Sequence, residues 1–339
     1  MKIHLLSDLH IEHFPDLAQF QDMYKERYGN ELLENNNQAN VLVLAGDIGN
    51  VKKVGYQQFL VKASALYEHV IIVGGNHEFY GNEYFECMAK MKEICKEVGE
   101  NVHFLDKSKV EIVDSETKEV YVFVGAILWS NIPEESQLYV ESAMNDYRLI
   151  KIKESGADSA TLLRTKHTVQ MFKEESEYIK QEIEKAKINQ QKVIVVSHNA
   201  PLNRGVSAPQ FETVDNGSTR SLNYAFATDL SSIMDDHVIA WLFGHTHYSS
   251  LQKFNNTIVA SNQLGYLRGF SKEENSYKVD WILDTNNLNL ASIPKFVPYP
   301  PKSQTQTTNA SGASSSETVN SNSSSNPSKF SNILSFFKK

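Results

Sequence analysis

The sequence has little cysteine and no long hydrophobic run. Its only two cysteines, Cys87 and Cys95, lie eight residues apart in a segment that we expect to be helical, too far along the axis for a disulfide. We expect both to be buried thiols in a reducing compartment. No apolar stretch approaches the roughly 18 residues of a membrane span, and the opening stretch MKIHLLSDLH meets an acid and a histidine too early for a secretory leader. These absences predict a soluble, cytoplasmic protein.

Positive charge is also in short supply. The 339 residues include 33 Lys and Arg against 41 Asp and Glu, a formal net charge of −8 at pH 7. Affinity for nucleic acid rests on cations that neutralise phosphates, so this balance argues against a dedicated nucleic-acid-binding protein, although a local basic pocket is compatible with it. The length and the 41% of apolar residues suffice for one large α/β domain or two smaller ones.

Short apolar runs rich in β-branched residues recur along the chain. They are 2–6, 41–46, 69–75, 120–129, 192–197, 238–244, 256–261 and 277–283. Most are continuously apolar, as expected for strands covered on both faces. Between several of them lie helical patterns, at 83–98 and 160–188. The alternation predicts an α/β layered fold, with antiparallel pairing among the later, more closely spaced strands.

We expect one domain, residues 1–300, followed by a tail. Residues 17–40 are interpreted as a helix and surface loop inserted after the first strand, and 130–190 as a helical insert. From 301 to 339 the chain is rich in Ser, Thr and Asn, a composition that predicts disorder because it buries too little apolar surface. Its apolar and basic end, KFSNILSFFKK, is either a simple chain end or a weak contact for a membrane surface or a partner.

Polar residues with metal-binding side chains follow five of the expected strands. The blocks are SDLH at 7–10, GD at 46–47, GGNHE at 74–78, SHN at 197–199 and GHTH at 244–247. In an α/β sheet, side chains from distant segments converge on ligands at the carboxyl ends of strands. A single Asp there would be read as a helix cap, but five successive blocks indicate one common site. The glycines in three of them allow the backbone to approach an ion closely.

The side chains in these blocks form a set of oxygen and nitrogen donors suited to Mn²⁺, Fe or Zn²⁺, without a thiolate. The set is too large for one ion and fits two ions that share a carboxylate. Such ion pairs hold the attacking and departing oxygens in displacement at phosphorus. The candidate ligands are Asp8, His10, Asp47, Asn76, His198, His245 and His247.

In these blocks and their order, spanning 8–247, the sequence resembles the calcineurin-like metallophosphoesterase superfamily, whose pattern is DxH, GDxx, GNHE, a lone His and GHxH. The resemblance implies a four-layer αββα sandwich of two mixed β-sheets. It also implies a hydroxide held between two metal ions that attacks phosphorus, with Mn²⁺ favoured and Fe, Zn, Ni or Co compatible. By this resemblance Asp8, His10 and His247 hold the first metal, Asn76, His198 and His245 hold the second, and Asp47 bridges both.

The resemblance further implies that His77 assists the leaving group as a general acid and does not bind metal. In the protein-phosphatase branch an Asp three residues after the bridging Asp orients this histidine, and here that position is Asn50. An amide can hold an imidazole tautomer but carries no full negative charge. We therefore expect His77 to be oriented by Asn50 or by its own loop, and no close kinship with the serine/threonine protein phosphatases. Glu78 is expected to position that loop or a nearby histidine, or to form a simple salt bridge.

Finer features, SDLHIE at 7–12 and MNDYRLI at 144–150 among them, resemble a branch of small phosphoesterases without a settled substrate. A guanidinium matches a phosphate in a bidentate manner, and a tyrosine ring can stack on a base. A surface or structural role is the alternative for each candidate. The candidates for substrate contacts are Arg148, Arg204, Arg220, Tyr80 and Tyr224.

The leading hypothesis is a dinuclear-metal-dependent phosphoesterase acting on a small phosphate ester, as a monoesterase, diesterase or pyrophosphatase. A nuclease of the same superfamily is a second hypothesis, but it would need a basic channel and a capping domain, which the acidic charge and the short chain after His247 do not favour. A non-catalytic interaction scaffold is a third. Such scaffolds lose metal ligands or the catalytic histidine, and here all are present.

Overall fold

The computed structural model describes residues 1–33, 39–212, 222–268, 276–288 and 290–295. The predicted disordered tail, 301–339, lies outside these residues, as does Arg220.

The first β-sheet has five strands in the order β13-β1-β2-β3-β4. Strands β1 to β4 run parallel, and β13 is antiparallel to β1 at the edge. The strands are β1 (Lys2–Leu6), β2 (Val41–Ala45), β3 (His69–Val73), β4 (Val102–Phe104) and β13 (Ile282–Asp284).

The second sheet has six strands in the order β11-β12-β10-β9-β6-β5. Its four central strands are parallel, and β5 and β11 pair antiparallel at the two edges. The strands are β5 (Ser108–Val113), β6 (Val120–Ala126), β9 (Lys192–Ser197), β10 (Val238–Phe243), β11 (Leu251–Phe254) and β12 (Thr257–Ser261). A separate small ribbon pairs β7 (Lys151–Ile152) with β8 (Thr161–Leu162).

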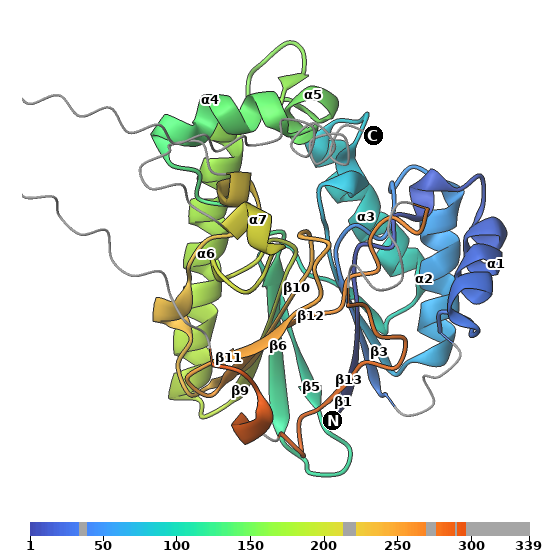
Figure 1. Ribbon diagram of the computed structural model, residues 1–339, viewed down its shortest axis with the longest axis vertical. Coiled ribbons are helices and arrows are strands. Elements are labelled where there is room, and N and C mark those ends of the chain that lie inside the picture. The colour runs from blue at the N-terminus through green and yellow to red at the C-terminus, as the bar shows by residue number, and fades with distance from the viewer. Residues whose placement is uncertain (34–38, 213–221, 269–275, 289, 296–339) are drawn as a thin grey trace, which may run out of the picture.

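Helices cover the outer faces of both sheets (Figure 1). Helices α1 (Leu17–Tyr28), α2 (Val54–Leu66) and α3 (Tyr84–Val98) lie beside the first sheet, and α6 (Thr165–Ile188) lies beside the second. The shorter helices are α4 (Glu134–Ala143), α5 (Asp146–Leu149) and α7 (Pro209–Glu212). Single 3₁₀ turns are η1 (Ile11–His13), η3 (His77–Phe79), η4 (Leu222–Ala225), η5 (Ser231–Ile233) and η6 (Leu290–Ser292).

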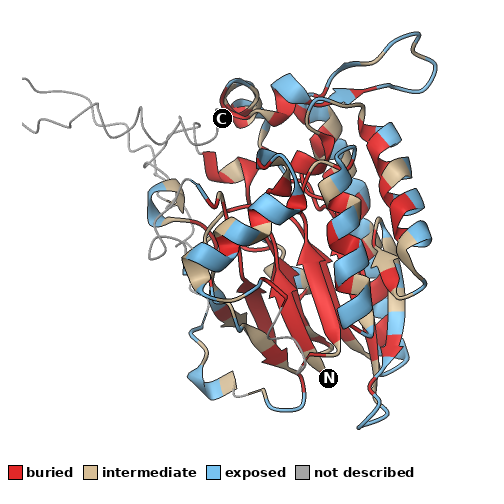
Figure 2. Ribbon diagram, turned by 90° about the vertical axis from the view of Figure 1, so that its right-hand side faces the viewer, coloured by how far each residue is buried: buried red, intermediate tan, exposed pale blue. Residues whose placement is uncertain are grey.

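Two apolar cores hold these layers together. Alternate residues of both sheets, such as Leu5, Val43, Phe123 and Leu242, form one core between the sheets. The intervening residues pack against the helices, so the central strands are buried along nearly their whole length (Figure 2). Side chains alternate between the two faces of a strand, and continuously apolar strands therefore require a cover on each face. The result is the predicted four-layer αββα sandwich of two mixed sheets.

The expected strands are present. The last one, expected at 277–283, is found as β13 at Ile282–Asp284. Among the described residues, α2, β4, β5 and β11 are further elements that the sequence analysis did not name. Cys87 and Cys95 are buried in α3 as free thiols, as expected. Within the described ranges, no helix combines the length and apolar character needed to cross a membrane.

Candidate metal centre

The loops that leave five parallel strands meet at one end of the two sheets. β1, β2 and β3 of the first sheet and β9 and β10 of the second all direct their carboxyl ends toward this point, as parallel strands must. The structure brings together every candidate ligand named from the sequence, which are Asp8, His10, Asp47, Asn76, His198, His245 and His247.

These side chains form two adjoining groups. In the first group, one ligand atom each from Asp8, His10, Asp47 and His247 lies within 4.8 Å of the others. In the second, the same holds for Asp47, His198 and His245. The amide oxygen of Asn76 lies 3.0 Å from His198 Nε2 and so extends the second group. Asp47 is the member common to both.

The backbone is strained at most of these residues. Left-handed φ angles are uncommon for residues other than glycine and cost of order 1 kcal/mol or more, so their clustering marks functional sites. The residues are Asp8 (φ 55°), His10 (50°), Asp47 (53°), His245 (73°) and His247 (49°). Each lies in a loop after a strand end, and the strained turns bring the side chains together at that end of the sheets.

Two glycines permit the close approach of the loops. A Cβ atom on Gly46, whose φ is +84°, would lie 2.4 Å from His198 Nδ1. A Cβ atom on Gly75 would lie 2.3 Å from Asp47 Oδ1. Both distances are far below van der Waals contact, which explains why the blocks GD and GGNHE need glycine at these positions.

The surroundings shift the pKa values of the candidate ligands in different directions. Burial raises the pKa of Asp8 to about 6, whereas Asp47 raises the pKa of His198 to about 9 against the effect of burial. Burial alone would raise the pKa of Asp47, but His198, His77 and His10 hold it well below its usual range. Burial, together with the nearby charge of His198, lowers the pKa of His245 to about 3. Burial likewise holds the pKa of His247 well below its usual range. Metal binding requires ionised carboxylates and neutral imidazoles, a state that these shifts favour for Asp47, His245 and His247, whereas His198 would release a proton on binding.

A model of the calcineurin-like phosphoesterase family matches residues 1–249. The chain belongs to this family. It is also 31% identical over 289 residues to uncharacterized protein L509 of Acanthamoeba polyphaga mimivirus, across 84% of this chain and 96% of that protein.

The fold is similar to solved structures at much lower sequence identity. A phosphopantetheinyl hydrolase from Mycobacterium tuberculosis superposes with a TM-score of 0.54 at 15% identity, covering 79% of this chain and 90% of that one. A dimetal phosphatase from Danio rerio superposes with a TM-score of 0.42 at 12% identity, covering 77% and 86%. The first of these likenesses supports the fold assignment.

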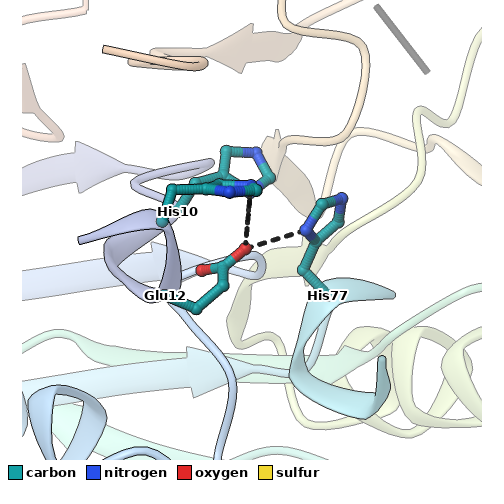
Figure 3. Close-up of side chains that lie close together, drawn as sticks. His10, Glu12 and His77 are labelled. Carbon is teal, nitrogen blue, oxygen red and sulfur yellow. Dashed lines mark hydrogen bonds and ion pairs between the residues drawn. The ribbon is translucent and has the colours of Figure 1, made fainter. Parts of the chain in front are cut away.

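In this member of the family, His77 lies beside the first group of candidate ligands. Its backbone N–H donates to Asp47 Oδ1 at 2.8 Å. Its ring stacks on that of Tyr80, with the ring centroids 4.1 Å apart. It packs edge-on with the ring of His10, with the centroids 4.3 Å apart. Its Nδ1 lies 2.8 Å from Glu12 Oε1, as Figure 3 shows. The other ring nitrogen, Nε2, is 3.3 Å from the hydroxyl of Tyr266.

Of the two supports expected for the His77 ring, Asn50 does not contact it, whereas Tyr80 of the same loop stacks on it. The side-chain amide of Asn50 donates to the carbonyl oxygen of Tyr80 at 2.8 Å, and its oxygen accepts the N–H of Lys52 at 3.1 Å. Asn50 therefore ties down the loop that carries Tyr80, and a carboxylate from another strand end contacts the His77 ring. A full negative charge is thus present beside His77 after all.

Glu78 positions the loops, one of the roles expected for it. Its carboxylate accepts the backbone N–H groups of Asp47 at 3.0 Å, Ile48 at 2.8 Å and Gly75 at 2.7 Å. Burial raises the pKa of Glu78 to about 8. The side chain joins the loops after β2 and β3, and so fixes the spacing between Asp47 and Asn76.

Three residues at the site were not among the candidates from the sequence: Glu12, Asp146 and Tyr266. The Oδ1 atom of Asp146 accepts the Asn76 amide at 2.9 Å and the Tyr80 hydroxyl at 2.7 Å. Both Glu12 and Asp146 lie in stretches that the sequence analysis had quoted, SDLHIE and MNDYRLI. In the second stretch, the acid two residues before Arg148 reaches the site, whereas Arg148 itself contacts Asn145.

Only some of the residues predicted to contact the substrate lie at the site. Tyr80 lines the small cavity at the site, together with Met144, Asn145 and Tyr266. Arg148 is exposed, and its guanidinium contacts the Ser142 carbonyl and the Asn145 side chain. Arg204 and Tyr224 are half-buried, and neither lines this cavity.

Proposed function

We propose that the protein is a dinuclear-metal-dependent phosphoesterase that hydrolyses a small phosphate mono- or diester. The observation that carries this proposal is the carboxylate of Asp47. Its Oδ1 lies 3.5 Å from His198 Nε2, in one group of ligands, and its Oδ2 lies 3.8 Å from His10 Nε2, in the other. A carboxylate with one oxygen toward each group is suited to two cations that share it.

The residues present fit two metal ions. The donors are carboxylate, imidazole and amide oxygen, for which we favour Mn²⁺, with Fe, Zn²⁺, Ni²⁺ or Co²⁺ also suited. When bound, the cations would supply Lewis acidity, which lowers the pKa of a water molecule and neutralises charge on phosphoryl oxygens. Asp8, His10 and His247 would hold one ion, Asn76, His198 and His245 the other, and Asp47 both.

His77 is placed to give a proton to the departing oxygen. In the metal-free chain, burial alone would lower the pKa of His77, but Asp47 and Glu12 raise it to about 9. With Nδ1 engaged by Glu12, the nitrogen that faces the cavity is Nε2. A positioned general acid of this kind contributes roughly 10²- to 10⁴-fold to the rate.

The cavity favours a small substrate. Its lining combines Tyr80, Met144, Asn145 and Tyr266 with the ligand residues, and no Lys or Arg lines it in the described part of the chain. Substrate charge would therefore be neutralised mainly by the cations and by His77. A long polyanion such as nucleic acid finds no basic track here.

A panel of esters tests this function. The wild-type chain with Mn²⁺ should hydrolyse at least one of p-nitrophenyl phosphate, bis(p-nitrophenyl) phosphate, a cyclic nucleotide or a dinucleoside polyphosphate. Replacing His77 with Ala should lower turnover of a poorly activated ester about 10²-fold or more while both metals stay bound. The control His69→Ala removes a half-buried histidine at the opposite end of β3 and should change nothing. Wild-type protein that binds both metals but turns over no ester would contradict the proposal.

A further inference from the structure

We propose that Glu12 is the positioning residue of this site, holding the leaving-group histidine His77 and the metal ligand His10 through one carboxylate oxygen. The inference rests on the proposed function. Glu12 contacts both the proton donor and a ligand of the first metal position. It takes the place of the acid that the protein phosphatases carry after the bridging Asp.

The contacts are shared at one atom. Glu12 Oε1 accepts from His77 Nδ1 at 2.8 Å and lies 3.3 Å from His10 Nδ1 (Figure 3). The side chain of Glu12 is only 10% exposed. The same oxygen also lies 3.5 Å from Nε2 of the more exposed His13. Hydrogen bonds between a largely buried carboxylate and imidazoles are stronger when they are charge-assisted than when both groups are neutral.

The backbone around Glu12 is rigid enough to position it. His10 N–H donates to the Asp47 carbonyl and Ile11 N–H to the Ile48 carbonyl, both at 3.0 Å. Lys53 Nζ donates to the carbonyl of Glu12 itself at 2.7 Å. Turn η1 is thereby fixed to the loop after β2, which carries the shared ligand Asp47.

Glu12 also decides which ring nitrogens face the site. Because the carboxylate accepts from Nδ1 of both histidines, each Nδ1 carries a hydrogen, and Nε2 is the atom left for other partners. His10 Nε2 lies 2.9 Å from His247 Nε2, among the ligand atoms of the first group. His77 Nε2 faces Tyr266 and the cavity. Loss of Glu12 would free both rings to turn.

Substitution of a residue that orients a metal-binding histidine typically weakens metal binding by 10- to 100-fold. Loss of the contact to His77 acts differently, because only esters with a poor leaving group need its proton. Glu12→Gln should therefore produce two separable defects. A purely structural role would slow all esters to the same extent.

The experiment compares Glu12→Gln with Glu97→Gln, which changes an exposed glutamate on α3 whose carboxylate accepts from the Gln57 amide. At saturating Mn²⁺, Glu12→Gln should lower kcat for phenyl phosphate at least about 10-fold and for 2,4-dinitrophenyl phosphate by less than about 3-fold. The apparent Mn²⁺ affinity should fall about 10-fold. In a His77→Ala background, Glu12→Gln should still weaken Mn²⁺ binding but add no further loss of kcat. Equal loss of kcat for both esters would overturn the proposal.

A readout without turnover keeps this test separate from that of the proposed function. In metal-free protein labelled with ¹⁵N-histidine, the Nδ1–H groups of His10 and His77 should be protected from exchange with solvent. The His77 resonance is identified by its loss in His77→Ala. Glu12→Gln should remove both protected resonances and Glu97→Gln neither. Protected resonances that persist in Glu12→Gln would overturn the role of Glu12, whereas an inactive wild type with protected resonances would contradict only the phosphoesterase function.

Discussion

At the scale of single residues, the site depends on acids that hold its other side chains. Asp146 accepts the amide N–H of Asn76, and this fixes the amide so that its oxygen faces His198 at 3.0 Å. Tyr80 shares the same carboxylate oxygen. Asp146 comes from α5, a short helix outside both sheets. The second group of candidate ligands therefore depends on a segment that follows none of the strands that carry its members.

Replacing Asp146 with Ala should weaken the second metal position. Without its partner, the Asn76 amide can rotate and its oxygen leaves the ligand group, which should cost about 10- to 100-fold in affinity for one of two ions. Isothermal titration with Mn²⁺ would measure this. Asp158→Ala, an exposed residue of the β7–β8 loop, is the matched control and should bind as wild type does. Unchanged affinity in Asp146→Ala would mean that Asn76 is held by its own loop.

The sequence located the candidate ligand residues better than the residues that hold them. The candidate ligands follow strand ends in recognisable blocks, so their residue types and order predicted that they would lie together. The partners of His77 and Asn76 lie 65 and 70 residues away along the chain, and an acid in a short turn or helix has no feature that reveals which distant side chain it reaches. The prediction of Asn50 failed for this reason, because position in a motif was taken for proximity in space.

At the scale of elements, the metal centre depends on how tightly the strand-end loops pack. The loops after β2 and β3 are joined by Glu78, and the Cα of Gly75 faces Asp47 and His198 so closely that no side chain fits.

Elements with uniform apolar faces were predictable, but α2 was not. Its apolar residues Val54, Val61 and Leu66 are exposed and blur the helical period. Edge strand β5 is only partly buried and lacks the apolar run of a central strand.

Gly75→Ala should damage this loop while the rest of the fold persists. The new Cβ would lie 2.3 Å from Asp47 Oδ1 and 2.8 Å from His198 Cε1, and forcing it in should cost about 1–3 kcal/mol of unfolding free energy and much of the metal affinity. Gly49→Ala in the neighbouring loop is the matched control, since its Cβ would meet nothing closer than 3.4 Å. Urea unfolding and Mn²⁺ titration measure both effects, and equal behaviour of the two variants would refute the packing argument.

At the scale of the whole molecule, stability rests on the buried strands and on the polar groups enclosed with them. His4 on β1 is fully buried, and its Nδ1 lies 2.7 Å from the Tyr67 hydroxyl that follows α2. Burial lowers the pKa of His4 to about 4, from 6.5. The apolar runs alone could not indicate how the two sheets face each other, because that arrangement depends on contacts between alternate residues of strands far apart in the chain. Only the family resemblance predicted it.

The buried His4 should make the fold sensitive to mild acid. Its folded-state pKa is depressed, so the unfolded chain takes up the proton first and stability falls as pH drops from above 6.5 toward 4. Between pH 7.5 and 5 the contribution is about 2 kcal/mol. Urea unfolding measures the stability lost between pH 7.5 and pH 5. This loss should be about 2 kcal/mol smaller for His4→Asn than for wild type. Parallel losses in the two proteins would show that His4 is not the group responsible.

The central claim is that one carboxylate, Asp47, joins two metal positions. The direct measurement is the number of Mn²⁺ ions bound per chain at equilibrium, for metal-free wild type and for Asp47→Asn. The account predicts two ions for wild type and marked weakening of both in the variant, because Asp47 belongs to both groups of ligands. A wild-type chain that binds one ion, or an Asp47→Asn variant that binds two as tightly as wild type, would contradict it.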